Sequence, residues 1–364
     1  MGGGHGAVEA VGLNAARWRG RRTLVTGVTG FKGGWLALWL RELGAEVVGY
    51  SLPPPTTPSL FERARVGEGV RWIPGDVRDL AHVRRAVAEA RAEVVFHLAA
   101  QPLVRASYEA PVETFDTNVM GTVNVLEALR EDGSARAVVV VTSDKCYENR
   151  EWPWPYREQD ALGGHDPYSS SKACAEIAAR AYFRSYFKAR GVGVATVRAG
   201  NVIGGGDWAR DRIVPDIVTA IEQERSALVR NPASLRPWQH VLEPLYGYLT
   251  LAEKLADGAL GLSDAWNFGP NPEAVRPVSD LASALCAHWG DGARWHAAET
   301  AQPHEARTLA LDSSKVRAEL GWRPRLTLDE ALEWTAHWYK DCQQGADMRA
   351  RSLEQIRRYQ EIAT

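Results

Sequence analysis

The sequence predicts an α/β fold built on a doubly wound parallel sheet, with a smaller C-terminal α/β portion. Three observations carry this prediction. Short apolar runs alternate with segments of helical period over the first 200 residues. The runs are nearly continuous in apolar residues, as strands covered on both faces are. A glycine-rich turn stands between the first run and the first helical segment, where parallel α/β proteins turn from strand to helix.

The expected elements follow one another in a regular order. The first strand is expected at residues 23–26, and the helix after it repeats apolar residues at Trp35, Leu36, Trp39 and Leu40 and ends at Gly44. Further helices are expected over residues 79–91, 112–131 and 168–190. The other strands are expected within residues 45–50, 70–79, 92–100, 135–143 and 193–200.

Composition narrows the class of protein. The chain has 364 residues and a formal net charge of −2, so it can bury a large core, and nothing in its charge indicates nucleic acid or an anionic membrane as partner. No stretch reaches the roughly 20 apolar residues of a membrane span. The four cysteines form no CxxC pair and no His-Cys metal spacing, so we expect reduced thiols, a cytoplasmic protein and no metal site.

A glycine turn is the first functional signal. Gly27, Gly30 and Gly33 stand between the first strand and the first helix, with Phe31 and Lys32 among them. Glycines in this position let a pyrophosphate approach a helix N-terminus, and they indicate a dinucleotide site in a Rossmann sheet. The alternative is a turn that merely needs glycine.

The cofactor is expected to be NAD. An acidic residue normally ends the second strand of an NAD site. Here that strand ends in Gly49-Tyr50-Ser51, and no Arg stands there for a 2′-phosphate, so NADP remains open. Asp76 after the third strand is expected near the adenine, unless it only favours the start of the next helix. Four further residues that follow the third and fourth strands are assigned to the same site: Val77, Leu98, Ala99 and Ala100.

A second signal follows the fifth strand. Tyr168 and Lys172 are four residues apart, so they share one face of a helix that Asp166 and Pro167 are suited to begin. A nearby ammonium favours the phenolate form of tyrosine, and a phenolate can remove a hydroxyl proton from a sugar. Ser143, at the end of the fifth strand, is expected to join the pair. The alternative is an exposed Tyr–Lys pair on a helix surface.

The glycine spacing and the Tyr-x-x-x-Lys pair together resemble the extended short-chain dehydrogenases/reductases, which include nucleotide-sugar dehydratases and epimerases. Longer blocks, among them TSDKCYENREWPWPYREQDALGGHDPYSSSK and RAGNVIGGGDWARDR, are similar to the CDP-glucose 4,6-dehydratases over roughly residues 20–335. The chain departs from that pattern at Val28, where a polar residue, commonly His, is expected, and at Pro155, where Gly is expected.

The resemblance implies a lyase that converts CDP-D-glucose to CDP-4-keto-6-deoxy-D-glucose and water. The sugar would be oxidised at C4, lose water across C5 and C6, and take the hydride back at C6, so that NAD is recycled. Tyr168, with Lys172 beside it, is implied as the base at the 4-hydroxyl, whose oxygen Ser143 would hold. Asp144 is implied as the acid for the 6-hydroxyl and Lys145 as the base at C5.

The second half of the chain is implied to hold the nucleotide-sugar. Asn201 is a candidate phosphate or sugar contact. Arg236 is a candidate pyrophosphate clamp, because a guanidinium forks onto phosphate oxygens. Arg212 and Arg307 are candidates of the same kind, with a solvated surface position as the alternative for each.

The chain is expected to divide at three places. Residues 1–20 are predicted to be a flexible extension, 21–200 an NAD-binding Rossmann domain with later segments interleaved, 201–340 mainly a nucleotide-sugar-binding domain, and 341–364 a C-terminal helical tail. The helices expected at 112–131 and 168–190 would form the four-helix contact of a homodimer, as in related enzymes, or else be buried within one subunit.

Other functions fit the same fold. A nucleotide-sugar 4-epimerase, or a dehydratase for another nucleobase, would use the same Tyr–Lys pair. An epimerase needs no acid–base pair at C5 and C6, so Asp144-Lys145 favours dehydration. Related thymidine-sugar dehydratases carry Asp-Glu there, which favours the cytidine branch for this chain. A non-catalytic, cofactor-binding regulator is the alternative from a different class, and the retained Tyr168 and Lys172 argue against it.

Overall fold

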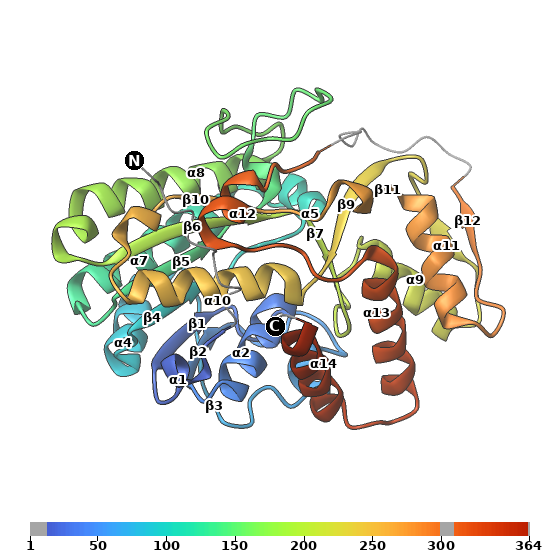
Figure 1. Ribbon diagram of the computed structural model, residues 1–364, viewed down its shortest axis with the longest axis horizontal. Helices are drawn as coiled ribbons and strands as arrows, with labels where there is room; N and C mark the ends of the chain where they lie inside the picture. Colours follow the sequence, from blue (N-terminus) through green and yellow to red (C-terminus); the bar gives the residue numbers. More distant parts are fainter. Residues whose placement is uncertain (1–12, 299–308, 363–364) are drawn as a thin grey trace, which may run out of the picture.

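The computed structural model describes residues 13–298 and 309–362. Its centre is a parallel sheet with the strand order β10-β6-β5-β4-β1-β2-β3, and helices lie against both faces (Figure 1). The predicted α/β fold with a doubly wound parallel sheet is therefore confirmed. The seven strands are β1 (Arg22–Thr26), β2 (Glu46–Ser51), β3 (Val70–Pro74), β4 (Val94–His97), β5 (Ala137–Val141), β6 (Gly193–Ala199) and β10 (Ala265–Phe268).

The predicted helices are present, and two of them are less regular than expected. The helical run expected at 112–131 contains a π-helical segment, η1 (Asp116–Met120), and the run expected at 168–190 ends in η3 (Phe183–Phe187) and η4 (Lys188–Arg190). The α-helices of the first half are α1 (Ala15–Trp18), α2 (Phe31–Glu42), α3 (Leu60–Arg63), α4 (Leu80–Ala90), α5 (Val104–Glu109), α6 (Pro111–Phe115), α7 (Gly121–Asp132) and α8 (Pro167–Tyr182).

The second half of the chain adds helices and two small sheets beside the main one. Strand β9 pairs in parallel with β7 and antiparallel with β11, and β8 pairs in parallel with β12. These strands are β7 (Asn201–Ile203), β8 (Ala227–Val229), β9 (Leu235–His240), β11 (Val275–Pro277) and β12 (Trp295–Ala297). The helices are α9 (Ile213–Glu222), α10 (Leu242–Ala256), α11 (Val278–Trp289), α12 (Ser314–Leu320), α13 (Leu328–Gln343) and α14 (Met348–Ile362), with the short turns η2 (Asp144–Cys146), η5 (Leu260–Leu262) and η6 (Pro272–Ala274).

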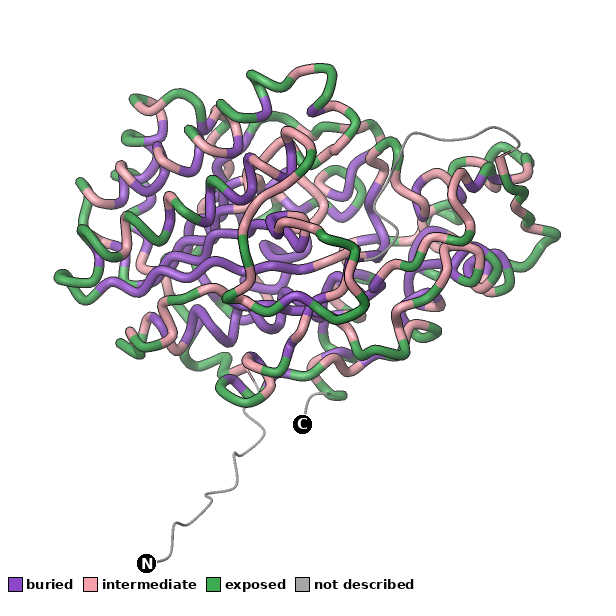
Figure 2. Tube along the Cα trace, turned by 90° about the horizontal axis from the view of Figure 1, so that it is seen from above, coloured by how far each residue is buried: buried purple, intermediate pink, exposed green. Residues whose placement is uncertain are grey.

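The core lies on both faces of the main sheet. All five residues of β5 and all seven of β6 are buried, and the central strands form the buried middle of the molecule in Figure 2. Strands that are covered twice have no solvent face, which is why β5 is a continuous run of Ala and Val and why the Thr196 and Arg198 side chains of β6 are buried as well. No helix among the described residues has both the length and the apolar character needed to cross a bilayer.

The two halves of the chain share one core. Strand β10 completes the main sheet next to β6, and α14 packs against α2, where the ring of Tyr359 meets that of Trp39 edge-on at 5.7 Å between centroids. Of the extension expected at residues 1–20, residues 1–12 lie outside the described ranges. Residues 13–20 belong to the folded body, because Trp18 is fully buried and its ring stacks on that of Phe96. The predicted domain boundaries stay a prediction.

Candidate functional site

The glycine turn lies where the carboxyl ends of β1 and β4 meet, at the point where the strand order of the sheet reverses. Gly27 has φ +74°, and a Cβ there would be 2.8 Å from the backbone nitrogen of Ala99. The hydroxyl oxygen of Thr26 accepts hydrogen bonds of 3.1 Å from the N–H groups of Leu98 and Ala99. The structure thus brings the segment of Leu98, Ala99 and Ala100 against the predicted glycine turn.

Gly30 and Gly33 shape the start of α2. Gly30 is the N-cap residue, without a side-chain cap, and its N–H donates to the carbonyl oxygen of Gly27 at 3.1 Å. A Cβ at Gly33 would be 2.1 Å from that same carbonyl oxygen, so no other residue fits there without a backbone shift. The turn therefore holds the uncapped N-terminus of α2 open, which is the arrangement that suits a pyrophosphate.

The adenine end of the expected site has two distinctive features. Val28 is fully buried, and a Cβ at Gly49 would be 2.5 Å from its Cγ1 atom, so Val28 fills the space above β2. Asp76 accepts hydrogen bonds from the Arg78 side chain at 2.9 and 2.6 Å, and these bonds hold the pKa of Asp76 below its usual range. The neighbouring Val77 is buried.

The Tyr–Lys pair projects from the first turns of α8, as predicted. Asp166 caps this helix by accepting a 2.9 Å hydrogen bond from the N–H of Ser169. Tyr168 is 7% exposed and Lys172 is 6% exposed. The Lys172 ammonium donates to the carbonyl oxygen of Val141, the last residue of β5, at 3.3 Å. The pair is therefore buried against the end of β5 and is not a surface pair.

Ser143 joins this pair to the acidic residue beside it. Its hydroxyl donates to the Oδ1 atom of Asp144 at 3.0 Å and accepts a 3.2 Å bond from the N–H of Lys145. Burial raises the pKa of Tyr168 to about 12, while a hydrogen bond with Ser143 and the charge of Arg212 act in the opposite direction. Ser143, Asp144 and Tyr168 thus form one buried cluster.

The surroundings of Asp144 shift its carboxyl group toward the protonated form. It is 5% exposed, and burial raises its pKa above the ordinary value. The charges of Lys145, Lys32 and Arg236 oppose this effect. Lys145 itself, in the short turn η2, is only partly buried.

Two buried amines, those of Lys32 and Lys172, belong to this part of the structure and interact with each other. Burial is the main cause that lowers the pKa of Lys32 to about 8, helped by the charges of Arg212 and Lys172 and opposed by that of Asp144. Burial likewise lowers the pKa of Lys172 to about 8, opposed by Glu176. Lys32 therefore connects the glycine turn with the Tyr–Lys cluster.

Two of the four residues predicted for the second half of the site also reach the cluster. Arg212 is the N-cap residue of α9, and its side chain is 33% exposed. The guanidinium donates to Asp207 at 2.7 Å, and its charge acts on Tyr168. Arg236 lies on β9, and its charge acts on Asp144. Asn201 is the first residue of β7 and is partly buried. Arg307 lies outside the described residues.

Sequence reasoning missed the buried groups behind the cluster. Glu176 and Arg198 form an ion pair of 2.8 Å at the junction of α8 and β6. A signal was present, since Glu176 stands four residues after Lys172 and so one helical turn further along α8. Within residues 13–298 and 309–362 no group of three or more His, Cys, Asp or Glu side chains is arranged to hold a metal ion.

Comparisons with known proteins agree with this geometry. Residues 24–335 match a family model described as GDP-mannose 4,6 dehydratase. The chain is 50% identical over 352 residues to a CDP-glucose 4,6-dehydratase of Salmonella typhimurium, covering 95% of this chain and 98% of the relative. It is 30% identical over 323 residues to a dTDP-glucose 4,6-dehydratase of Mycolicibacterium smegmatis, covering 88% and 93%.

Solved structures share the fold. A dTDP-glucose 4,6-dehydratase of Streptomyces venezuelae, solved with NAD bound, superposes with a TM-score of 0.75 at 24% identity, over 90% of this chain and 99% of the other. The protein MoeE5, solved with UDP-glucose and NAD, superposes with a TM-score of 0.74 at 26% identity, over 88% and 99%. The predicted resemblance is confirmed, and the chain belongs to the GDP-mannose 4,6 dehydratase family of extended short-chain dehydrogenases/reductases.

Proposed function

We propose that the protein is an NAD-dependent CDP-glucose 4,6-dehydratase, a lyase that forms CDP-4-keto-6-deoxy-D-glucose and water from CDP-D-glucose. The observation that carries the proposal is the 50% identity over nearly the whole chain to a CDP-glucose 4,6-dehydratase. The buried cluster of Ser143, Asp144, Tyr168 and Lys172 supports it, because it places an acid and a phenol at the end of β5.

The glycine turn fits NAD. A Cβ at Gly27 or Gly33 would collide with backbone atoms, so both positions keep the backbone low enough for a pyrophosphate to approach α2. Phe31, Lys32 and the backbone of Leu98 and Ala99 would line the same site, with Ala100, Asp76 and Val77 beside it. When bound there, NAD accepts the hydride from the sugar and returns it.

The chain's own groups would perform the proton transfers. Tyr168 takes the proton of the sugar 4-hydroxyl while Ser143 holds that oxygen. In the protein without its cofactor, burial raises the pKa of Tyr168 to about 12. Additional positive charge near the phenol is therefore needed to stabilise the phenolate. The positive ring of the oxidised cofactor would supply that further charge, beside the amine of Lys172 that is already present.

The elimination needs one side chain that acts as a base at C5 and another that acts as an acid on the hydroxyl group of C6. Asp144 is suited to protonate the departing 6-hydroxyl, because burial raises its pKa. Lys145 would remove the C5 proton, which the 4-ketone makes acidic. The proton taken from C5 and the hydroxyl lost from C6 leave a double bond that receives hydride at C6 and a proton at C5.

The nucleotide-sugar would be held from the second half of the chain. Arg212 and Arg236 bring positive charge next to Tyr168 and Asp144, where a diphosphate would be bound. Asn201 and Arg307 complete the proposed substrate contacts.

We further propose a cytoplasmic homodimer. An apolar surface lies on α6, η1 and α8, where Val112 is 81% exposed, Met120 47% and Ile177 50%. A shallow hollow in it is lined by Pro111, Val112, Phe115, Asp116, Val119, Met120 and Cys174. A second copy that laid the same helices on this surface would bury it in a four-helix contact. The four cysteines are free, which suits a reducing compartment.

A substrate panel tests the proposed function. The purified protein is incubated with CDP-, dTDP-, UDP- and GDP-glucose, first without added cofactor and then with NAD, and the 4-keto-6-deoxy product is measured. We expect product from CDP-glucose. Formation of CDP-galactose would identify an epimerase instead, product only from another nucleotide would change the substrate, and no turnover of any nucleotide would favour a non-catalytic protein.

A further inference from the structure

Glu176 and Arg198 form a buried ion pair directly behind the Tyr–Lys cluster. Each side chain is only 3% exposed. The guanidinium of Arg198 donates to both carboxylate oxygens of Glu176, with Nε to Oε1 at 2.9 Å and Nη2 to Oε2 at 2.8 Å. Such a fork is the strong geometry for this pair of groups.

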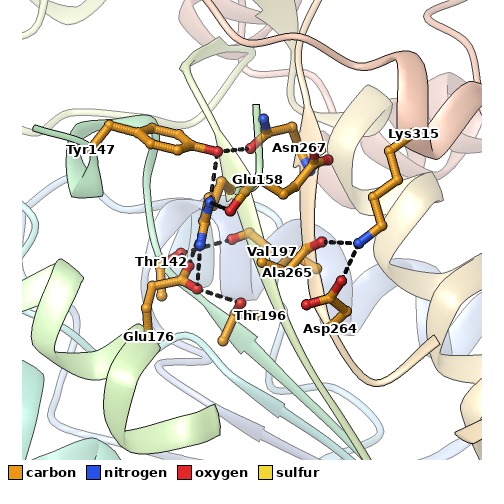
Figure 3. Close-up of polar contacts among 11 residues, drawn as sticks. Thr142, Tyr147, Glu158, Glu176, Thr196, Val197, Asp264, Ala265, Asn267 and Lys315 are labelled. Atoms are coloured by element: carbon orange, nitrogen blue, oxygen red, sulfur yellow. Dashed lines mark hydrogen bonds and ion pairs between the residues drawn. The ribbon is translucent and has the colours of Figure 1, made fainter. Parts of the chain in front are cut away.

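The carboxylate of Glu176 also holds the end of β5. It accepts hydrogen bonds of 2.5 Å from the hydroxyls of Thr142 and Thr196 (Figure 3). Thr142 immediately precedes Ser143, Asp144 and Lys145 in the chain. Glu176 lies on α8, the helix that carries Tyr168 and Lys172, so one carboxylate joins the two segments that must meet for the reaction.

Arg198 extends this connection into the second half of the chain. Its Nη1 atom donates to the hydroxyl of Tyr147 at 2.6 Å, and that hydroxyl donates to the side chain of Asn267 on β10 at 2.8 Å. The N–H of Asn267 donates to Glu158 at 2.9 Å (Figure 3). The pair is therefore held from several elements and has little freedom to move.

Glu176 also supplies negative charge to Lys172, which stands four residues earlier on the same helix. The titratable groups that face Lys172 are Glu176 on α8, Cys146 in η2, Lys32 on α2 and His97 on β4. Among the causes that act on the pKa of Lys172, burial lowers it and Glu176 is the main one that raises it.

We propose that Glu176 is a positioning residue for the dehydration: it fixes the end of β5 against α8 and keeps the amine of Lys172 protonated, while Arg198 holds the Glu176 carboxylate in place. This inference rests on the proposed function. It assigns Glu176 no contact with substrate or cofactor, and it makes the alkaline limit of the reaction depend on a residue behind the site.

The first test is the pH profile of Glu176→Gln. Without the carboxylate charge the amine of Lys172 loses its proton at lower pH, so the alkaline limb of kcat moves toward acid by about 1 pH unit, with KM nearly unchanged. Glu176→Asp keeps the charge and is expected to retain most of the wild-type profile. An unmoved limb in Glu176→Gln would overturn the proposal.

A double variant separates positioning from stability. Glu176→Gln leaves the Arg198 guanidinium buried without its partner, which destabilises the fold. Combining it with Arg198→Met removes that charge, so the thermal midpoint is expected to recover while the alkaline limb stays displaced. If the limb returns to its wild-type position together with the thermal midpoint, the role of Glu176 is structural only.

A measurement without substrate keeps this inference distinct from the proposed function. The pKa of Lys172 is followed by NMR of labelled lysine side chains, with Lys172→Arg to assign its signal. It is expected to fall by about 1 unit in Glu176→Gln. If the pKa of Lys172 falls in the variant but the wild-type protein converts no nucleotide-sugar, only the proposed function is contradicted. If the pKa of Lys172 is unchanged in Glu176→Gln and the wild-type protein is an active dehydratase, only the positioning role of Glu176 is contradicted.

Discussion

Gly200 lies so close to Asp144 that a Cβ at residue 200 would be 3.1 Å from the Oδ2 atom of Asp144 and 3.2 Å from Cγ of Pro237. Gly200 directly precedes β7, so the backbone at the start of the second half forms one wall around the proposed acid. A side chain at residue 200 would therefore crowd the carboxyl group of Asp144.

Gly200→Ala should therefore lower kcat by about tenfold, which corresponds to about 1.4 kcal/mol in the barrier. The added methyl group crowds the carboxyl of Asp144 but changes neither the glycine turn nor Tyr168. Steady-state kinetics with CDP-glucose check the value. Gly261→Ala is the matched control, because nothing lies within 4 Å of a Cβ there. Equal activity of both variants would show that Asp144 tolerates displacement.

Tyr168→Phe should lose hydride transfer by a factor of about 10² to 10⁴, the usual contribution of a positioned general base. The phenol is buried, and the ring remains in the variant, so the fold and cofactor affinity should be retained. Single-turnover absorbance of reduced cofactor measures the chemical step. Tyr186→Phe, an exposed tyrosine on η3, is the control. Normal turnover of Tyr168→Phe would remove this residue from the base role.

Asp144→Asn and Lys145→Ala should both stop the reaction after oxidation, but at different steps. Each variant should accumulate reduced cofactor, because the C4 oxidation needs neither group. Asp144→Asn should still exchange the C5 proton with deuterated solvent, whereas Lys145→Ala should not. Mass spectrometry of the recovered nucleotide-sugar distinguishes the two. Wild-type product formation by either variant would assign its role to another residue.

Gly33→Ala should weaken NAD binding at least tenfold and destabilise the fold by about 1–3 kcal/mol, the usual cost of overpacking. The new Cβ would be 2.1 Å from the carbonyl oxygen of Gly27, so the turn has to move. Calorimetric titration and denaturant unfolding measure the two effects. Gly34→Ala is the control, since the atoms nearest to its Cβ would belong to side chains and not to the glycine turn, with Cδ2 of Leu60 at 2.9 Å and Cγ2 of Val66 at 3.6 Å. Equal affinities would mean that the turn does not bind the pyrophosphate.

His97 should make the fold sensitive to acid. Burial lowers the pKa of His97 to about 3, against about 6.5 in an unfolded chain. As the pH falls, the unfolded state therefore binds a proton at this histidine before the folded state does. The contribution of neutral His97 to the free energy of unfolding is fully present above about pH 6.5 and is lost as the pH falls toward 3. Its hydrogen bond with Thr26, 2.7 Å long, helps to hold the ring at the end of β4.

Between pH 6.5 and 5 this loss amounts to about 2 kcal/mol for one group. Glu243 and Glu253, whose pKa values burial raises to about 6 and about 7, act in the opposite direction over this range, so a variant is needed to isolate His97. His97→Gln should show a smaller drop in the free energy of unfolding than the wild type, and exposed His165→Gln the same drop. Identical pH slopes in all three proteins would contradict the assignment.

The sequence predicted those parts of the site that a few neighbouring residues encode. The glycine turn and the Tyr168–Lys172 pair are short-range patterns with a fixed geometry, and each was found where it was expected to lie. Contacts between distant segments carry no such pattern. The hydrogen bond of Trp35 with Gly205 lays the loop before α9 on α2, and this long-range packing lets Lys32 approach Arg212.

The pKa shifts and the buried ion pair of the site could not be predicted from the sequence either. A phenol with a nearby lysine suggested an acidic tyrosine, yet burial raises the pKa of Tyr168 in the protein alone. The ion pair of Glu176 with Arg198 joins residues 22 positions apart. The sequence around each residue contains no pattern that predicts this pairing.

Strand β10 has a consequence for how reactants come and go. Its residues Ala265–Phe268 pair with Thr196–Ala199 of β6, although β10 belongs to the half of the chain that supplies the proposed diphosphate contacts. A hinge motion that separated the two halves would break this ladder and would cost several backbone hydrogen bonds in each catalytic cycle. Entry and escape of the reactants therefore have to leave this ladder intact, which confines any rearrangement during the reaction to segments outside the main sheet.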